Sequence, residues 1–311
     1  MLKIAGKSIV ERLISNIEKT IQGDITEIVF VIREDFGKDI ESQLYEIAKK
    51  YNTNGKIVYQ SEPLGTGHAI LCAGDSLTGN IVVGFADTMF DADFQIDTHS
   101  DAIVWVKQIP NPEAFGVIQL NEKNEIKAFI EKPKTFISDL AIIGIYYFKS
   151  GGELRAELQY LIDNDIQEKG EFQLTTAMEN MRKKGRIMTP GKVSQWLDCG
   201  NKDATVDSNR EVLKSHASEH YIADSAELDH TTIIPPCFID ERVVIRNSVV
   251  GPHVSIGRNS SISHSVISDS IIQNDTAIER KSLYRSMIGS KVILKGRADE
   301  LSIGDYNQLN S

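Results

Sequence analysis

The spacing of apolar residues changes near residue 220 and divides the chain into two regions. Before this point, short apolar runs alternate with longer segments in which apolar residues recur at helical spacing, which predicts buried strands alternating with amphipathic helices. The expected strands are 26–32, 55–60, 80–87 and 101–109, and the expected helices are 8–21, 36–51 and 67–77. This rhythm predicts a doubly wound α/β domain on a mixed, mostly parallel sheet.

A second group of elements follows in the first region. FGVIQL (115–120), a polar turn and IKAFIEKP (126–133) have the pattern of a β-hairpin, and AIIGIYYF (141–148) that of a buried strand. The remaining expected elements are helices at about 151–164, 172–184 and 202–216, and a strand within VSQWLDCG at 193–200.

Beyond residue 220, aliphatic residues recur at a spacing of six, interrupted by five-residue slips. They are Ile239, Ile245, Val250, Ile256, Ile262, Ile267, Ile272, Ile278, Ile288 and Leu294. This period is neither helical nor that of a simple strand, and it is typical of the hexapeptide repeats of a left-handed parallel β-helix. A run of irregular short strands is the alternative. We therefore expect two domains, 1–218 and 219–311, the second with about three coils from Ile239 to Leu294.

Composition and charge narrow the class of protein. The 311 residues carry a formal net charge of −10, which argues against nucleic acid or an anionic membrane surface as a partner. Phosphorylated small molecules need only a local group of donors and stay possible. Cys72, Cys199 and Cys237 are too scattered for a disulfide framework or a zinc site. With neither a long apolar run nor a signal-peptide pattern, we expect a cytoplasmic protein.

The stretch QSEPLGTGHA (60–69) places two glycines and a histidine between a strand-like run and a helix-like run. Glycine and threonine are common where a helix begins, so an ordinary turn with a capped helix is one interpretation. A loop whose bare backbone meets a ligand is the other. The stretch by itself leaves both open.

Four stretches in this order resemble the sugar-1-phosphate nucleotidylyltransferases: QSEPLGTGHA, GFADTMF, FGVIQL with FIEKP, and QWLDCG. The resemblance covers nearly the whole chain and includes the C-terminal hexapeptide repeats. It implies transfer of a nucleotidyl group from an NTP to a sugar 1-phosphate, giving an NDP-sugar and pyrophosphate, with Mg²⁺ as cofactor. UTP or dTTP and glucose 1-phosphate are the expected substrates, and the β-helix is expected to form a homo-oligomer.

The resemblance assigns the first stretch to the nucleotide base. Gln60 carries both a donor and an acceptor, which suits the imide edge of uracil or thymine. Gly65 would let the backbone approach the base, and Thr66 opens a helix whose free N–H groups can serve a polar ligand. For His68, packing at the start of the helix and contact with the ligand are both left open.

The resemblance assigns Asp87 and Asp198 to catalysis through the metal. Asp87 ends the expected strand 80–87, at the edge where open α/β sheets bind ligands, and Asp198 supplies a second carboxylate. Oxygen ligands of this kind, completed by phosphates, suit Mg²⁺. Taken alone, either aspartate could be a turn or cap residue, as we expect of Asp91 and Asp93.

The resemblance assigns FGVIQL and FIEKP to the sugar phosphate. Gly116 would offer its N–H to a sugar hydroxyl, and Glu131 would accept hydrogen bonds from hydroxyls. Lys132 would pair with the phosphate and belongs to the catalytic group. A solvated Glu–Lys pair before a proline is the alternative.

Three more residues are assigned to the sugar by resemblance. Ile143 and Gly144 match the strand that lines the sugar pocket, and Glu171 matches a second carboxylate facing the sugar. Stabilisation of the first turn of a helix explains Glu171 equally well.

The start of the chain departs from the family pattern. Members begin with a strand and a G-x-G-T-R-L loop ending in P-K-P, whereas this chain starts directly at MLKIAGKSIV. That loop would hold phosphates and offset charge on the leaving pyrophosphate, so we expect a truncated chain or a misplaced start codon, with impaired activity. The alternatives are a non-catalytic sugar-nucleotide-binding or regulatory homologue, and acyl transfer at the β-helix with His253 or His264 as base.

Overall fold

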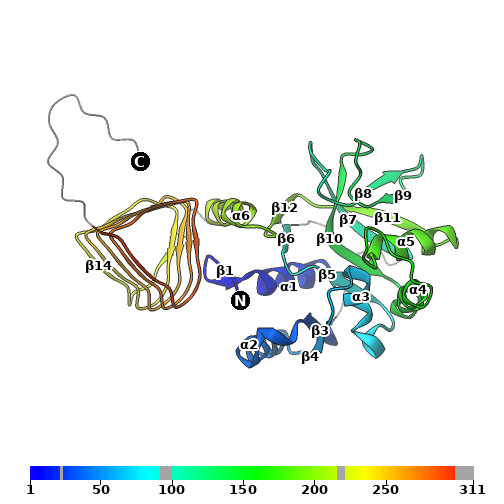
Figure 1. Ribbon diagram of the computed structural model, residues 1–311, viewed down its shortest axis with the longest axis horizontal. Coiled ribbons are helices and arrows are strands. Elements are labelled where there is room, and N and C mark those ends of the chain that lie inside the picture. The colour runs from blue at the N-terminus through cyan, green and yellow to red at the C-terminus, as the bar shows by residue number, and fades with distance from the viewer. Residues whose placement is uncertain (22–23, 92–99, 216–220, 298–311) are drawn as a thin grey trace. The chain divides into compact units, whose positions relative to one another are not determined.

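The computed structural model describes residues 1–21, 24–91, 100–215 and 221–297. The chain forms two compact units, which we call the sheet unit (Met1 and Ile9–Asp198) and the solenoid unit (Leu2–Ser8 and Cys199–Ser311). The sheet unit runs from blue to green in Figure 1, and the solenoid is the yellow to red coil. The solenoid unit therefore begins before the expected domain boundary at 218/219, because the last helix, α6 (Lys202–Ser215), belongs to it.

The sheet unit contains one large sheet and two strand pairs. The large sheet has six strands in the order β11-β7-β10-β8-β9, with β5 also paired to β10. Its strands are β5 (Ile81–Gly84), β7 (Ala102–Gln108), β8 (Val117–Leu120), β9 (Ile126–Ile130), β10 (Leu140–Phe148) and β11 (Met188–Lys192). The two pairs are β3 (Glu27–Ile32) with β4 (Asn54–Tyr59), and β6 (Thr88–Asp91) with β12 (Gln195–Asp198).

The mixed α/β fold is confirmed, but antiparallel pairs outnumber the parallel ones that the pattern favoured. In the described chain, β10 runs antiparallel to β5, β7 and β8, while the parallel pairs of the sheet unit are β3 with β4 and β7 with β11. Strand β10 is buried along nearly its whole length. Burial on both faces produces the same continuous apolar run in either direction, so the sequence pattern could not distinguish the two.

Helices cover both faces of the large sheet (Figure 1). They are α1 (Ile9–Thr20), α3 (Thr66–Leu71), α4 (Gly151–Asp163) and α5 (Leu174–Lys183), whereas α2 (Lys38–Lys50) packs on the pair of β3 and β4. Short 3-10 turns lie at Glu34–Phe36 and Gly74–Ser76. Successive residues of β7 point to opposite faces of the sheet, so that Trp105 packs with Leu13 of α1 on one face and Val104 packs with Leu158 of α4 on the other. Full burial of one such side chain stabilises the fold by about 1.5–3 kcal/mol.

Strand β11 was not expected from the sequence. It contains Pro190, which argues against a strand because proline lacks the N–H needed for a ladder. β11 lies at the end of the sheet order, where one side of the strand needs no partner, so the proline is tolerated there.

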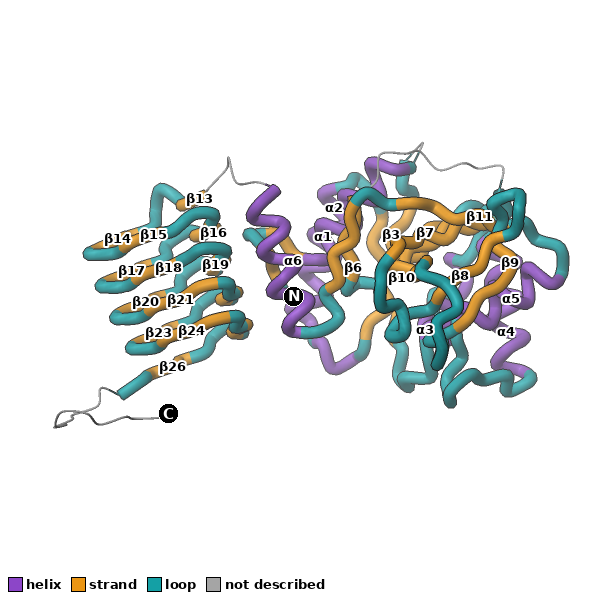
Figure 2. Tube along the Cα trace, turned by 90° about the horizontal axis from the view of Figure 1, so that it is seen from above, coloured by secondary structure: helices purple, strands orange, loops and turns teal. Residues whose placement is uncertain are grey.

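The solenoid unit is a parallel β-solenoid of about four turns, with three sheets as its sides, as Figure 2 shows. The first sheet contains β13 (Tyr221–Ile222), β16 (Cys237–Ile239), β19 (Val254–Ile256), β22 (Ile271–Ile272) and β25 (Met287–Ile288). The second contains β14 (Glu227–Asp229), β17 (Val244–Arg246), β20 (Ser261–Ser263), β23 (Ala277–Glu279) and β26 (Ile293–Lys295). The third contains β15 (Thr232–Ile233), β18 (Val249–Val250), β21 (Val266–Ser268) and β24 (Ser282–Tyr284).

The register explains the five-residue slips. Ile239 pairs with Ile256, 17 residues further on (256 − 239), and Ile256 pairs with Ile272, 16 residues further on (272 − 256). A coil is thus one or two residues shorter than three hexads, and each slip is one shortened side. The repeat architecture is confirmed, with more coils than expected because the first begins at β13, before Ile239. Its left-handedness stays a prediction.

The N-terminal hairpin β1 (Lys3–Ile4) and β2 (Lys7–Ser8) is hydrogen-bonded to the first sheet of the solenoid. The N–H of Lys3 donates to Oε1 of Gln273 at 3.1 Å, and Nε2 of Gln273 donates to the Lys3 carbonyl at 2.9 Å. The N–H of Ala5 donates to Oγ of Ser255 at 3.2 Å. Ser255 and Gln273 are both buried, so these bonds replace water at polar groups of the first sheet.

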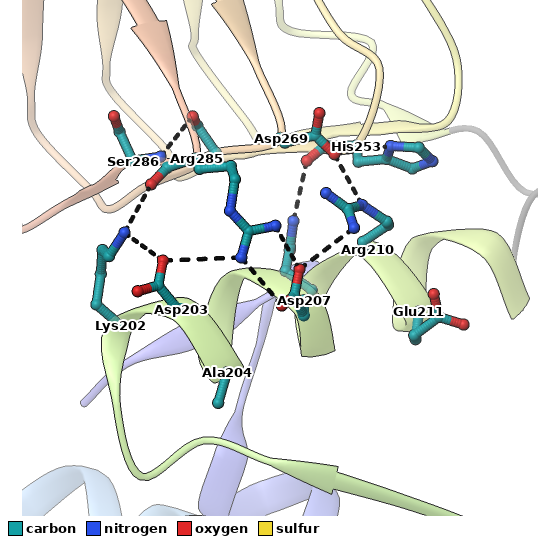
Figure 3. A network of polar contacts seen from close by, with 12 residues as sticks. Lys202, Asp203, Ala204, Asp207, Arg210, Glu211, His253, Asp269, Arg285 and Ser286 are labelled. Atoms are coloured by element: carbon teal, nitrogen blue, oxygen red, sulfur yellow. Dashed lines mark hydrogen bonds and ion pairs between the residues drawn. The ribbon is translucent and has the colours of Figure 1, made fainter.

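Helix α6 is joined to the solenoid by a buried asparagine and by ion pairs at the coil corners (Figure 3). Asn209 is fully buried; it accepts from the Ser255 hydroxyl at 2.6 Å and donates to the His253 carbonyl at 3.1 Å. Arg285 binds both carboxylate oxygens of Asp207, at 2.6 and 3.0 Å. In the described chain, no helix is long and apolar enough to cross a membrane.

Candidate active site

The structure brings Asp87 and Asp198 together. Asp87 lies in the turn between β5 and β6, and Asp198 ends β12, which pairs with β6 so that Asp198 is opposite Thr88. Loss of hydration raises the pKa of the Asp87 carboxyl, a backbone hydrogen bond offsets part of this, and the negative charge of Asp198 raises the pKa further. Two carboxylates held within electrostatic reach of each other favour a cation between them.

The two carboxylates of Asp87 and Asp198 fit a divalent cation whose remaining ligands are phosphate oxygens. Within the described residues, no group of three or more His, Cys, Asp or Glu side chains gathers to enclose a metal ion. Mg²⁺ is commonly held by one or two carboxylates plus phosphate oxygens, so Asp87 and Asp198 would be sufficient as protein ligands. Asp91 is exposed at the end of β6 rather than in a loop, and Asp93 lies outside the described residues.

The side chain of Gln60 is held inside the loop that follows β4. Its Nε2 donates to the Gly65 carbonyl at 3.1 Å and lies 3.1 Å from Nδ1 of His68. With Nδ1 as acceptor, both N–H groups of the amide are engaged and only its carbonyl is left for a ligand. His68 therefore orients Gln60, a third role beside the two left open. The predicted pairing with an imide base requires Gln60 to release one of these partners.

Gly65 is required by its own surroundings. Its φ of +113° lies in a region that favours glycine, and a Cβ there would lie 2.7 Å from the carbonyl oxygen and 2.8 Å from the nitrogen of Phe172. The carbonyl of Phe172 accepts from the N–H of Gly67 at 2.8 Å, and the N–H of Phe172 donates to the Leu64 carbonyl at 2.8 Å. The loop thus pairs with residue 172, and contact of Gly65 with a base stays a prediction.

Thr66 ties the same loop to the start of α5. Its hydroxyl accepts from the N–H of Leu174 at 3.1 Å and donates to Oε1 of Gln173 at 3.1 Å. Thr66 is the first residue of α3, and its hydroxyl occupies one of the orphan donors at the start of α5. A role in binding the nucleotide is untested by these contacts.

Glu131 and Gly116 meet on the hairpin of β8 and β9. A Cβ on Gly116 would lie 3.0 Å from Oε2 of Glu131, so glycine leaves room for this carboxylate. The same oxygen accepts from the Thr175 hydroxyl at 3.2 Å. Loss of hydration raises the pKa of Glu131, although the charge of Lys132 and the Thr175 hydrogen bond act in the opposite direction. The hairpin thus presents a carboxylate that is only partly compensated.

Ile143 and Gly144 position the turn that carries Asp87. The side chain of Ile143 is 2% exposed and packs in the core, and its carbonyl accepts from the Thr88 hydroxyl at 2.9 Å. That this strand lines the sugar pocket stays a prediction. Gly144 has φ +83°, and its carbonyl accepts from the N–H of Phe85 at 2.9 Å. A bulge in the β10–β7 register between Ile142 and Tyr146 makes this contact with the turn possible.

Glu171 lies before α5 rather than in its first turn. It is exposed, and its Oε2 accepts from Nε2 of Gln173, the residue that precedes the helix, at 2.7 Å. Stabilisation of the first turn is therefore not its role, and contact with a sugar stays a prediction.

Several residues that connect these segments were missed. Phe115, next to Gly116, meets Trp196 edge to face with ring centroids 4.9 Å apart. Trp196 and Asp198 share one face of β12, since alternate residues of a strand point to the same side. Gln173 and Thr175 join the loop at Thr66 to the carboxylate of Glu131. In the sequence, the only indication of Phe115, Gln173, Thr175 and Trp196 was that each is an aromatic or polar residue close to a motif residue.

The two solenoid histidines considered as bases, His253 and His264, have structural partners. Nδ1 of His253 lies 3.1 Å from Oδ1 of Asp269, which also accepts from Nε of Arg210 at 2.9 Å, as Figure 3 shows. Nε2 of His264 lies 3.4 Å from Nδ2 of Asn247. These contacts provide no support for acyl transfer.

Residues 1–215 match the sequence model of a family described as nucleotidyl transferase. A bifunctional protein GlmU from Methanococcus aeolicus is 30% identical over 219 residues, which cover 69% of this chain and 49% of the relative. A glucose-1-phosphate thymidylyltransferase from Streptomyces antibioticus is 25% identical over 339 residues, covering 99% and 92%. The chain thus spans about half the length of the GlmU relatives that it matches.

Solved structures support the fold. A nucleoside-diphosphate-sugar pyrophosphorylase from Vibrio cholerae RC9 superposes with a TM-score of 0.58 at 18% identity, covering 68% of this chain and 90% of that one. A putative glucose-1-phosphate thymidylyltransferase from Bacillus anthracis superposes with a TM-score of 0.54 at 20% identity, covering 65% and 80%. At such identities, the likeness bears on the fold alone.

Proposed function

Because the chain belongs to the nucleotidyl transferase family, we propose that it joins an NTP to a sugar 1-phosphate, releasing pyrophosphate. The observation that carries the proposal is the approach of Asp87 to Asp198, with the pKa of Asp87 raised. Perturbed carboxylates of this kind cluster at functional sites. UTP or dTTP with glucose 1-phosphate are the proposed substrates, in line with the name of the Streptomyces antibioticus relative for the dTTP pair.

The reaction needs positioning and charge neutralisation more than proton transfer. A phosphate oxygen of the sugar 1-phosphate attacks the α-phosphorus in line, and it is already ionised, so no general base is required. Asp87 and Asp198 would hold Mg²⁺, which would offset the charge of the phosphates when bound. Lys132 would pair with the sugar phosphate, and Glu131 would orient the sugar through its hydroxyls.

The test is pyrophosphate release across a panel of NTPs and sugar 1-phosphates, with and without Mg²⁺. We expect the highest rate for UTP or dTTP with glucose 1-phosphate, and loss of the rate when Mg²⁺ is chelated. The impaired activity expected from the sequence is tested by comparing this chain with one that carries any upstream in-frame residues. Binding of sugar nucleotide without turnover in both would favour the non-catalytic homologue instead.

We also propose that the solenoid mediates a homo-oligomer. Its outer surface exposes large apolar side chains, with Val266 at 53%, Tyr284 at 67% and Ile293 at 74% exposure. Apolar surface of this kind is a common basis of association between copies. Light scattering coupled to size exclusion measures the oligomeric state, and a monomer would contradict the proposal. The three cysteines are free, which agrees with the cytoplasmic location that we propose.

A further inference from the structure

Lys169, in the turn before α5, contacts the backbone that carries Glu131 and Lys132. Its Nζ donates to the carbonyl of Glu131 and to the carbonyl of Lys132, each at 3.0 Å. An ammonium group has three donors in a flexible arrangement, and two of them here engage consecutive carbonyls. Hydrogen bonds to adjacent carbonyls restrict rotation of the peptide unit that lies between them.

Lys132 has a backbone conformation that needs such support. Its φ is +44°, in the left-handed region that residues other than glycine rarely adopt. Pro133 follows directly, and a proline favours an extended conformation in the residue before it. Backbone strain of this kind persists only where the surroundings hold it, and it clusters at ligand clamps.

Lys169 is itself presented by a tight turn. Its φ is +57° and that of Gly170 is +82°, so both central residues of the turn are left-handed. The N–H of Glu168 donates to the Glu171 carbonyl at 2.9 Å, and the N–H of Glu171 donates to the Glu168 carbonyl at 3.2 Å. This pairing is that of a two-residue hairpin turn, which fixes the direction in which Lys169 leaves the backbone.

The charge of Lys169 also acts on the carboxylate of Glu131. Loss of hydration raises the pKa of Glu131; the charge of Lys132, the Thr175 hydrogen bond and, more weakly, the charge of Lys169 lower it, whereas the charge of Glu168 raises it. Lys169 therefore favours the ionised form of Glu131 while holding the peptide that follows it.

We propose that Lys169 is a positioning residue for the sugar phosphate: it holds the Glu131–Lys132 peptide so that the carboxylate and the ammonium serve one substrate. The inference rests on the proposed function, because the substrate in question is the sugar 1-phosphate. Lys169 acts through the two carbonyls and is not assigned a contact with the substrate.

The kinetic test compares Lys169→Met, Lys169→Arg and, as a matched control, Lys127→Met. Lys127 is an exposed lysine of β9 in the same hairpin. In Lys169→Met we expect the KM for glucose 1-phosphate to rise about tenfold, the effect of losing a charged hydrogen-bond donor, with kcat and the KM for the NTP changed less than about twofold. Lys169→Arg keeps the donors and should recover most of this loss, and Lys127→Met should match the wild type.

The second measurement does not depend on activity. The ¹³C chemical shifts of the Glu131 and Lys132 carbonyls, which accept these bonds, should move upfield in Lys169→Met and stay close to the wild type in Lys169→Arg and Lys127→Met. Unchanged carbonyl shifts in Lys169→Met would show that Lys169 does not hold this peptide, and would overturn the inference.

The combined outcomes separate the inference from the proposed function. Shifted carbonyl signals with an unchanged KM for glucose 1-phosphate, or an equal rise in the KM of both substrates, would leave Lys169 a merely structural residue and would overturn the inference. If the wild type releases no pyrophosphate from any substrate pair, the proposed function fails. Calorimetric binding of glucose 1-phosphate by the same variants then decides the role of Lys169, with weaker binding in Lys169→Met alone as the supporting result.

Discussion

Carboxylates at the junction of α6 with the solenoid and carboxylates of the candidate site in the sheet unit are used in opposite ways. In the solenoid unit, the hydrogen bond and charge of Arg285 hold the pKa of Asp207 below its usual value, and a bond from Lys202 does the same for Asp203. In the sheet unit, loss of hydration raises the pKa values of Asp87 and Glu131. Paired carboxylates stabilise a fold, whereas carboxylates that lack full compensation favour the binding of a cation or of hydroxyl donors.

The same contrast holds for buried polar groups. Asn209, Ser255 and Gln273 of the solenoid unit are buried with protein partners at hydrogen-bond distance. In the candidate site of the sheet unit, Gln60 and His68 contact each other but stay partly exposed. We infer that the solenoid unit uses these buried polar side chains to hold its parts together, whereas the candidate site keeps Gln60 and His68 within reach of a ligand.

The largest effect should come from the aspartate pair. Asp87→Asn and Asp198→Asn should each lower turnover by about a thousandfold, equal to about 4 kcal/mol of transition-state stabilisation, because each removes a proposed metal ligand. Pyrophosphate release measures this, with Asp91→Asn, on the exposed end of β6, as the control. Turnover close to the wild type in both variants would remove the pair from the metal site.

Asp87→Asn should not destabilise the protein at neutral pH. Because the folded pKa of Asp87 is raised, the folded protein binds the proton more tightly than the unfolded chain, and the wild type loses stability as pH rises from about 3.9 through that folded pKa. The asparagine variant lacks this loss. Its melting temperature should equal that of the wild type near pH 3 and be higher at pH 7; a lower value at pH 7 would contradict the electrostatic assignment.

Asn209→Ala should give the next largest effect, and on stability rather than on activity. It leaves the Ser255 hydroxyl and the His253 carbonyl without this partner, which costs about 1–3 kcal/mol for buried groups. Denaturant unfolding measures the loss, and Glu211→Ala, on the same helix, should stay within about 0.5 kcal/mol of the wild type. If Asn209→Ala lowered turnover by more, expressed as a free energy, than it lowered the free energy of unfolding, the result would contradict the assignment of stability to the solenoid unit and of activity to the sheet unit.

Lys132→Ala should raise the KM for the sugar 1-phosphate by about ten- to thirtyfold and change the KM for the NTP little, because we propose that its charge pairs with the sugar phosphate alone. Steady-state kinetics with each substrate varied in turn measures the split. Lys134→Ala, two residues along the chain, controls for the loss of a nearby charge. Equal effects on both substrates would contradict the assignment of Lys132.

The smallest effect should come from Asp207→Asn. A lowered pKa means that the Asp207 carboxylate contributes stability above the unfolded pKa of about 3.9, and this is lost as pH falls through the folded value. The pair with Arg285 is partly exposed, so we expect the melting temperature to fall by only about 1–2 °C at pH 7 and not at all near pH 2. A difference that persists at the lowest pH would rule out the ion pair as its cause.

The sequence by itself determined the elements whose cause is local. Helices, strands and the repeat near a spacing of six follow from side chains a few positions apart, and all three appear at or near their expected residues. The four motif stretches likewise indicated the family, because each is a short run of neighbouring residues that can be recognised in the sequence without the fold. Even the five-residue slips, which only the register explains, were visible as spacings.

Tertiary structure decided whatever depends on residues far apart in the chain. The direction of β10, the membership of α6 in the solenoid unit, and the burial of the Ile143 side chain each depend on neighbours from other segments. Gly65 and Thr66 show the reason most clearly, since a position that suits a ligand is equally required by Phe172 and Leu174, more than 100 residues away. A sequence pattern indicates which type of residue a position requires, but only the fold shows which atoms of distant residues impose that requirement.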